Sequence, residues 1–186
     1  MRSLRPILFL QSVVAALLLG GVYGAQKSDA LAEKGEKLYT QFSLYYEKDH
    51  HITTNYRKGI LVPINTEVEF VKASRKQITI RIPSYNAVVH IENEEDYSGE
   101  KIEGIFKRTF GRQTVNLSEF TEMEQSSIKK GTVAVGMRKE AVIKAMGYPP
   151  HHKTPSLDMD QWRYWQNRFG TILVFFEDGK VSSIKN

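Results

Sequence analysis

Four short runs of β-branched and aliphatic residues, all between residues 60 and 92, constrain the fold more than any other feature of the sequence. The runs ILV, TEVEFVKA, QITIRI and AVVHI are separated by PIN, SRK and PSYN, which are typical turn sequences. In QITIRI the alternation is strict, so Ile78, Ile80 and Ile82 share one face of a strand. The pattern predicts a small antiparallel β-sheet or barrel over residues 53–98, SH3-like at most.

The residues before this region are ambiguous between helix and strand. Leu31, Leu38, Phe42, Tyr45 and Tyr46 recur at helical spacing, yet QFSLYYE is rich in aromatic residues that favour strands. For residues 26–52 we expect a helical segment that becomes extended near Phe42. After the strands, residues 99–115 are predicted to be a connector, because ENEEDYSGEKIE is acidic and lacks the spacing of an EF-hand calcium loop.

The C-terminal third begins with a short helix that has signals at both ends. In NLSEFTEMEQSSIKKG, Asn116 and Glu119 have the spacing of a capping box, and Gly131 lies where a helix ends. Helical spacing predicts an inward-facing stripe made of Phe120, Met123, Ser127 and Ile128.

A second helix is predicted in GMRKEAVIKAMGYPP. It follows Gly136 and Met137, Gly147 supplies its C-cap, and Pro149 prevents its continuation. Its apolar face is predicted to contain Val142, Ala145 and Met146. Its solvent-facing side is predicted to contain Arg138, Lys139 and Lys144.

Three strands complete the chain. DQWRYW, TILVFFE and KVSSIK have the pattern of antiparallel strands, and Asp178-Gly179 is a strong hairpin signal between the last two. Trp162 and Tyr164 alternate onto one face, which we expect to pack against the helices. Residues 116–186 are therefore predicted to form an α+β unit of two helices and a three-stranded antiparallel meander.

The order of these motifs resembles the BamE/SmpA/OmlA-like domain family of bacterial envelope proteins over residues 128–186. The motifs are an I-x-x-G helix end, a G-M helix start, V…G-x-P, a W-x-Y strand and a final V-x-F-x-x-G-x-V hairpin. In this chain they are formed by Ile128, Gly131, Gly136, Met137, Val142, Gly147, Pro149, Trp162, Tyr164, Val174, Phe176, Gly179 and Val181. The resemblance implies a two-helix, three-strand fold in non-enzymatic accessory proteins that help to insert β-barrels into the outer membrane. Related folds occur in protein-inhibiting modules.

The chain departs from the family pattern in three respects. Arg138 stands where a Ser or Thr usually follows G-M, so a side-chain helix cap is missing. The chain contains no cysteine and therefore no lipid-attachment site. The β-rich region before residue 128 has no counterpart in small members of the family.

The N-terminus has the organisation of a secretory signal peptide over residues 1–25. MRSLRP is a basic region, ILFLQSVVAALLLGGV an apolar one, and YGAQ supplies small residues for cleavage. We expect a periplasmic protein. The alternative is an uncleaved anchor in the inner membrane, because residues 7–25 are nearly long enough to span a bilayer.

Net charge and cysteine content exclude several classes of function. The formal net charge of +5 falls to +3 when the predicted leader, with Arg2 and Arg5, is removed. This surplus is too small to indicate nucleic-acid binding, and it is compatible with a weak contact to an anionic lipid surface. The absence of cysteine excludes disulfides, thiolate metal sites and a cysteine nucleophile.

The S-x-x-K spacing of penicillin-binding enzymes occurs twice in the sequence. The two copies start at Ser126 and Ser182, but the S-D-N motif that accompanies this spacing in those enzymes is absent. We therefore interpret both serines as surface residues of a helix and a strand, and predict no catalytic residues.

The histidine pairs are the candidates for a metal site. His50 is followed by His51, and His151 by His152, with Asp158 further along the chain. Because adjacent residues of a strand point to opposite faces, a pair seldom provides two ligands. The prediction is no metal or cofactor, with a zinc or copper site at His151, His152 and Asp158 as the alternative.

The strongest candidate for a functional surface is the second face of the C-terminal sheet. If Trp162 and Tyr164 face the helices, the opposite face presents Arg163, Trp165, Leu173 and Phe175. Such a patch is typical of partner contacts. The alternative is that the β-rich region packs against this face and buries it.

We predict a non-catalytic exported envelope protein that acts through protein–protein contacts, in outer-membrane protein assembly or envelope maintenance. Its expected partners are envelope proteins, including outer-membrane assembly components. The alternatives are a periplasmic metal-binding protein or an enzyme that uses the histidine pairs, and an inhibitor-like binding module.

Overall fold

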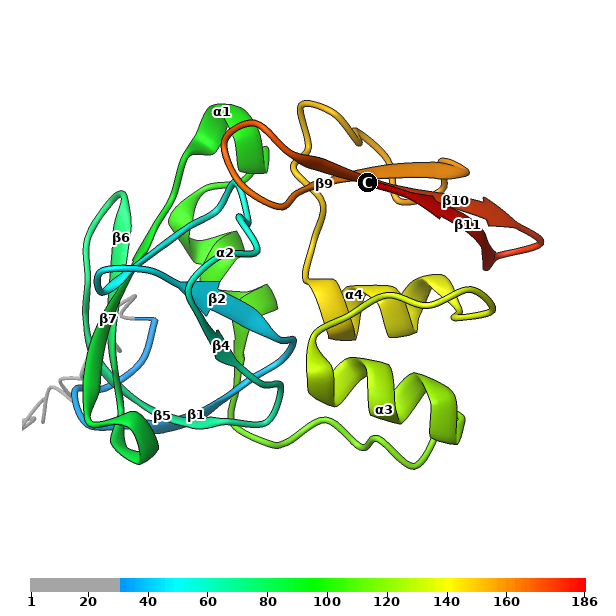
Figure 1. Cartoon of the computed structure of the whole chain (residues 1–186). Helices are drawn as coiled ribbons and strands as arrows, with labels where there is room; N and C mark the ends of the chain where they lie inside the picture. Colours follow the sequence, from blue (N-terminus) through cyan, green and yellow to red (C-terminus); the bar gives the residue numbers. More distant parts are fainter. Residues whose placement is uncertain (1–30) are drawn as a thin grey trace, which may run out of the picture.

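A computed structural model describes residues 31–186, so the predicted signal peptide lies outside the described residues. The chain is a mixed α+β protein with a strongly curled sheet (Figure 1). In the N-terminal part the elements are β1 (Lys37–Thr40), β2 (Leu44–Tyr46), β3 (His50–Ile52), β4 (Ile60–Val62), β5 (Glu67–Ala73), β6 (Gln77–Ile82), the 3-10 turn Pro83–Tyr85, β7 (Ala87–Glu92), α1 (Glu95–Ser98), α2 (Ile102–Thr109) and β8 (Phe110–Gly111). In the C-terminal part they are α3 (Glu122–Lys130), α4 (Lys139–Met146), β9 (Gln161–Trp165), β10 (Thr171–Glu177) and β11 (Lys180–Lys185).

Within residues 31–186, no helix has the length and apolar character needed to cross a membrane.

The four predicted strands are present as β4 to β7, and three of them form the centre of a six-stranded sheet. The strand order is β3-β7-β6-β5-β1-β8, antiparallel except for the parallel pair β3–β7. Ile78, Ile80 and Ile82 are fully buried on the concave face, as the alternation predicts. β4 does not join this sheet; it pairs instead with β2 in a separate two-stranded ribbon.

The helix predicted before Phe42 is wrong for the part that the structure describes, where the chain forms β1, whereas the extended conformation expected near Phe42 is observed as β2 and β3. Burial alternates along these strands: Leu38 and Thr40 are buried in β1, and Leu44 and Tyr46 in β2. The helical spacing was therefore coincidental, and the strand preference of the aromatic residues decides the conformation. β2 and β3 form a tight hairpin whose two turn residues both have positive φ.

The segment predicted as a connector, residues 99–115, forms α2 and β8. Ile102, Ile105, Phe106 and Thr109 are buried at helical spacing, so α2 closes the concave side of the curled sheet. β8 pairs with β1 at the sheet's edge.

The two helices and the three-stranded meander predicted for residues 116–186 are both observed. The strand order is β11-β10-β9, and α3 and α4 cover one face of this sheet (Figure 1). Trp162 and Tyr164 are completely buried in one core with Val142 and Met146. Further motif residues in this core are Met137, Val174, Phe176 and Val181, and Pro149 is buried nearby.

The capping box of α3 is not the predicted one. Thr121 accepts a hydrogen bond from the Glu124 amide, while the Glu124 carboxylate accepts one from the Thr121 amide. Asn116 instead accepts from the Ser118 amide at 3.0 Å in a local turn. α3 begins later than predicted, and Gly131 ends it as expected. Of the predicted stripe, Ser127 and Ile128 are buried and Phe120 packs against the core, whereas Met123 is exposed.

The basic residues of α4 do not simply point to solvent. Arg138 forms an ion pair with Glu124 at 2.8 Å. Lys139 donates to the main-chain oxygens of Asp158 and Met159 at 3.0 Å each. Burial lowers the pKa of Lys144. Arg138 is the N-cap residue of α4 and provides no side-chain cap; its own amide donates to the Glu124 carboxylate at 2.9 Å.

The N-terminal and C-terminal parts are joined by side chains of the loop that follows β3. Arg57 donates to the main-chain oxygens of Met146 at 2.9 Å and of Gly131. Asn55 donates to the oxygens of Met146 at 2.7 Å and Tyr148 at 3.1 Å. These donors satisfy carbonyl groups at the C-terminal ends of α3 and α4, which have no partners within the helices.

Replacing Gly147 by alanine is expected to lower the free energy of unfolding by roughly 2 kcal/mol. The residue has φ +73°, and an added Cβ would lie 2.9 Å from both the Phe42 ring and Asn55 Nδ2. Gly147 also has ψ −170°, a backbone conformation that alanine hardly adopts. Gly179→Ala is the control for a positive φ without crowding, because Gly179 also has φ +73° but has open space around it. The control should cost roughly 1 kcal/mol in urea denaturation. Equal losses in both variants would show that neither the crowding at the joint nor the backbone conformation of Gly147 adds to the cost.

Candidate functional site

The predicted docking face is the side of the β9–β11 sheet that faces away from α3 and α4. Arg163 of β9 lies directly opposite Leu173 of β10, and Trp165 opposite Thr171. The Nζ of Lys185 in β11 lies 5.2 Å from the centre of the Phe175 ring. Arg163, Trp165, Leu173 and Phe175 are all half-buried, and this set is called the docking face below.

The N-terminal part meets this sheet at its edge strand β9. The Arg57 amide donates to the Trp165 oxygen at 3.0 Å, and Tyr56 forms an isolated parallel bridge with Trp165. Figure 1 shows the curled sheet beside the β9–β11 sheet, with the turn between β9 and β10 reaching towards the loop that follows β3. This edge contact leaves Trp165 on the boundary between the docking face and the N-terminal part.

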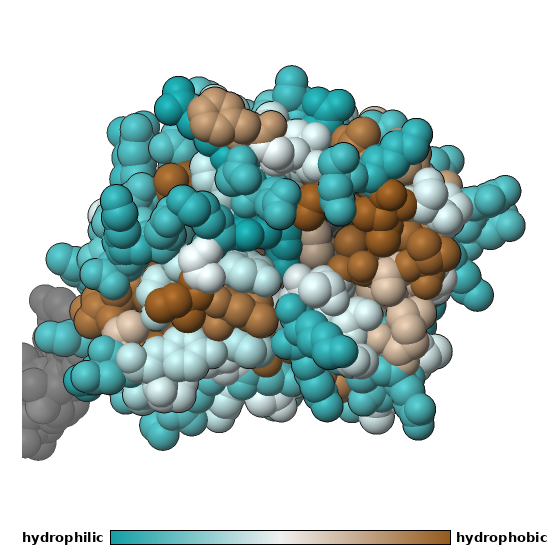
Figure 2. Space-filling view, in the orientation of Figure 1, coloured by the Kyte–Doolittle hydropathy of each residue, from teal (hydrophilic) through white to brown (hydrophobic). Residues whose placement is uncertain are grey.

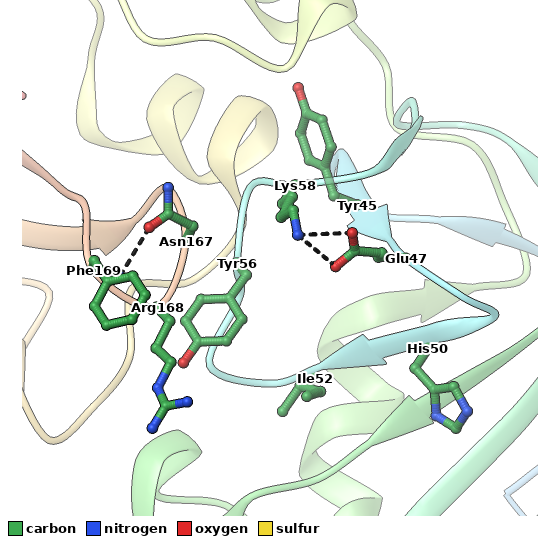
Figure 3. Close-up of a pocket in the computed structure, with 9 residues that line it drawn as sticks. All are labelled: Tyr45, Glu47, His50, Ile52, Tyr56, Lys58, Asn167, Arg168 and Phe169. Atoms are coloured by element: carbon green, nitrogen blue, oxygen red, sulfur yellow. Dashed lines mark hydrogen bonds and ion pairs between the residues drawn. The ribbon is translucent and has the colours of Figure 1, made fainter.

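A groove lies at this boundary, between the β2–β3 hairpin with the loop after it and the β9–β10 turn. It has a volume of about 440 Å³. It is called the aromatic groove below and is lined by Tyr45, Glu47, His50, Ile52, Tyr56, Lys58, Asn167, Arg168 and Phe169 (Figure 3). The buried partners Tyr46 and His51 alternate with the lining residues, so the strands themselves direct Tyr45, His50 and Ile52 outwards.

The opposite wall is the β9–β10 turn, which Asn167 holds in shape. Its side-chain oxygen accepts from the amides of Phe169 and Gly170, both at 2.9 Å. The main-chain amide of Gln166 also donates to the Gly170 oxygen at 2.9 Å. The turn therefore presents Arg168 and Phe169 from a fixed backbone; Phe169 is 88% exposed, and in Figure 3 Arg168 extends alongside Tyr56.

The charges in the aromatic groove are only partly balanced. Lys58 forms an ion pair with Glu47 at 2.8 Å, and the ring of His50 hydrogen-bonds Glu92 at 2.6 Å. Among residues 31–186, Arg168 has no carboxylate within ion-pairing distance; its guanidinium lies 5.7 Å from the centre of the Phe169 ring.

A second groove of about 610 Å³ continues from the first across Ile52, Tyr56 and Arg168, which line both. The remaining lining residues of the second groove are Thr54, Glu94, Tyr97, His152, Lys153 and Trp165. Trp165 therefore connects the second groove to the docking face. On the face shown in Figure 2, apolar areas cover the β2–β4 region and the region where the β9–β11 sheet meets α4.

The structure does not bring the predicted metal candidates together. The ring of His151 packs against Gly99, and His152 makes an edge contact with Tyr97 at 4.6 Å between ring centres. Asp158 accepts from the hydroxyl of Ser156 in its own loop. Across residues 31–186, no three His, Cys, Asp or Glu side chains form a group that could hold a metal ion.

The first histidine pair divides between surface and interior, as strand alternation requires. His50 lines the aromatic groove, whereas His51 is buried and its Nδ1 donates to the Tyr45 oxygen at 2.7 Å. Burial lowers the pKa of His51 to about 4. His51 is therefore a neutral core residue at pH 7.

The S-x-x-K serines have local roles. Ser126 and Lys129 are both exposed on α3. Ser182 donates to the Phe175 oxygen at 3.2 Å, beside the bulge between β10 and β11.

Several groups at the joint between the two parts have pKa values that burial shifts. Burial raises the pKa of Tyr164, whose hydroxyl donates to the Gly147 oxygen at 3.0 Å. Burial lowers the pKa of Arg57 and of Arg108. These groups bind main-chain oxygens or a carboxylate, so their environment has a structural cause.

Sequence reasoning missed the aromatic groove, although it identified Trp165 at its margin. The turn residues Arg168 and Phe169 interrupt the strand pattern, and a large apolar residue in a hairpin turn is the signal that could have indicated an exposed contact. Tyr45 and Tyr56 gave no such signal, because their exposure depends on strand pairing.

Comparison of the chain with models of protein families, with curated proteins and with solved structures yields no match.

Proposed function

We propose that this protein is a non-catalytic, exported envelope protein that binds a protein partner in outer-membrane assembly or envelope maintenance. The leader-like residues 1–25 support the periplasmic location. The motif order of residues 128–186 supports a BamE-like relationship, and the shared core of Val142, Met146, Trp162 and Tyr164 is compatible with it.

The observation that carries the proposal is a set of half-buried and exposed aromatic residues: Phe175 and Trp165 lie on the docking face, and Trp165, Tyr56 and Phe169 line the two grooves beside it. Aromatic and arginine side chains dominate binding energy at protein interfaces. The side chains whose pKa values shift most, His51, Tyr164 and Glu124, are buried and bind groups within the fold, so the surface is better equipped for binding than for proton transfer.

Photo-crosslinking in the native cell tests this function. A photoreactive amino acid at Phe175 should crosslink an envelope protein. The same group at Val88, which is 46% exposed on β7, should not. With the photoreactive group placed at Trp165 instead, Phe175→Ser should abolish the crosslink to this partner while changing the free energy of unfolding by only about 1 kcal/mol.

Export is tested in the same cells by mass spectrometry of the fractionated protein. The proposal requires a periplasmic protein whose chain begins after the predicted leader. Recovery of the uncleaved chain in the cytosol, or equal crosslinking from Phe175 and Val88, would contradict it.

A further inference from the structure

The aromatic groove and its continuation have the form of a channel for an extended chain. The two hollows, of about 440 and 610 Å³, meet at Tyr56 and Arg168. Each has the volume of a typical ligand site. Tyr56 and Arg168 form a ridge between the two grooves, which are called the first and second hollow here. An extended peptide lying across this ridge can place successive side chains in the hollows on either side.

The lining of this channel specifies the chemistry of the peptide. Tyr45, Tyr56 and Phe169 supply apolar surface in the first hollow, and Tyr97 and Trp165 supply it in the second. The charged lining residues are two carboxylates, Glu47 and Glu94, and three cations, Lys58, Lys153 and Arg168. Because Lys58 and Glu47 neutralise one another, the surplus positive charge lies on the ridge and in the second hollow.

We propose that this channel binds an extended peptide segment in which an acidic residue precedes an aromatic one, with the carboxylate on Arg168 and the aromatic ring between Tyr56 and Phe169. This inference rests on the proposed function and names the chemistry of the partner. Arg168 is suited to this role because a guanidinium binds a carboxylate through two parallel hydrogen bonds. The Asn167 turn fixes the backbone that carries both contact residues, so little ordering is required on binding.

The position of Arg168 favours a peptide over two other classes of ligand. A neutral glycan would offer the guanidinium only neutral oxygen acceptors, whereas a carboxylate offers a charge-assisted pair of hydrogen bonds. A lipid surface requires several cations on a convex or flat area, whereas Arg168 lies between two hollows.

The test uses the purified protein and a fluorescent peptide, Gly-Ser-Asp-Phe-Ser-Asp-Phe-Gly. A second peptide has lysine in place of both aspartates. Fluorescence polarisation should show binding of the aspartate peptide and at least about ten-fold weaker binding of the lysine peptide. Amide NMR signals of the β9–β10 turn should shift with the aspartate peptide.

Charge reversal makes the test specific. Arg168→Glu should weaken the aspartate peptide about ten-fold or more and improve the lysine peptide, since only the sign of the contact charge changes. Phe169→Ala should weaken both peptides several-fold. The matched control is Arg75→Glu on the β5–β6 turn, which makes the same change of charge on an exposed residue and should leave both affinities unchanged.

Three results would overturn the inference. They are no binding of either peptide, equal binding of both, or the same NMR shifts with a soluble peptidoglycan fragment or phosphatidylglycerol vesicles but not with peptide. If one of these occurs while crosslinks from Phe175 still form, the proposed function stands and only the peptide channel is wrong. If the peptide binds but no crosslinks form from Phe175, the proposed function is wrong and the peptide channel stands.

Discussion

Replacing Arg57 by alanine is expected to lower the free energy of unfolding by about 4 kcal/mol, the largest loss that we predict for a single side chain. The guanidinium donates to main-chain oxygens at the C-terminal ends of both α3 and α4. It also lies over the Tyr45 ring, 4.8 Å from the ring centre. Alanine would leave the Gly131 and Ala145 oxygens without these donors in a partly buried joint.

Burying the Arg57 guanidinium costs desolvation free energy, so the experiment must separate this cost from the gain of its hydrogen bonds. Burial lowers the pKa of Arg57, so the folded protein pays part of the desolvation cost of the guanidinium. The favourable field at two helix C-termini offsets that cost. Arg57→Lys keeps the charge but cannot reach both helices from one planar group, so it should recover less than half of the loss.

Arg57→Met separates the hydrogen bonds from the packing of the side chain. Methionine retains the apolar stem and removes the donors, and we expect a loss of about 3 kcal/mol in urea denaturation. A methionine variant as stable as the parent would show that the hydrogen bonds at the joint contribute nothing net. Near-UV circular dichroism of Trp162 and Trp165 would report whether the C-terminal core loosens first.

The parts of the fold that the sequence predicts well are those where one face of an element is buried. The alternation of Ile78, Ile80 and Ile82 identified β6, and the spacing of Val142 and Met146 identified the inner face of α4. In both elements one face is buried and the other is exposed, so apolar residues recur at the spacing of a strand or a helix, and this spacing is visible in the sequence.

The joint and the aromatic groove could not be predicted, because they depend on contacts between distant segments. Arg57 is one polar residue in a loop, and its partners are main-chain oxygens that carry no sequence signal. The groove is made from the β2–β3 hairpin and the β9–β10 turn, whose meeting is fixed by the pairing of Tyr56 with Trp165.

The capping box shows how a tertiary contact selects between two equivalent local signals. Asn116 with Glu119 and Thr121 with Glu124 both have the required spacing. Only Glu124 meets Arg138, whose amide, Nε and terminal nitrogen donate to its carboxylate at 2.8–3.0 Å. The start of α3 is therefore determined by the start of α4.

Loss of the Glu124 carboxylate is the second large effect that we expect, at about 3 kcal/mol for Glu124→Ala. The hydrogen bonds from the Arg138 side chain lower the pKa of Glu124 from 4.5 to about 2, against the opposing effect of burial. Because the folded-state pKa lies below the unfolded one, the contribution is complete above pH 4.5 and is lost as the pH falls towards 2.

This pH window distinguishes the ion pair from the shape of the side chain. Glu124→Gln keeps the size and can still accept from the Thr121 amide, so it should cost less than alanine at pH 7. Its free energy of unfolding should then fall less steeply than that of the parent between pH 4.5 and 2, because the glutamine cannot be protonated there. Glu122→Gln is the matched control, since Glu122 is exposed in the first turn of the same helix. If the parent and Glu124→Gln lose stability in parallel over this range, the stabilising role of the Glu124–Arg138 pair is wrong, and the position of α3 must be set by the packing of Ile128 alone.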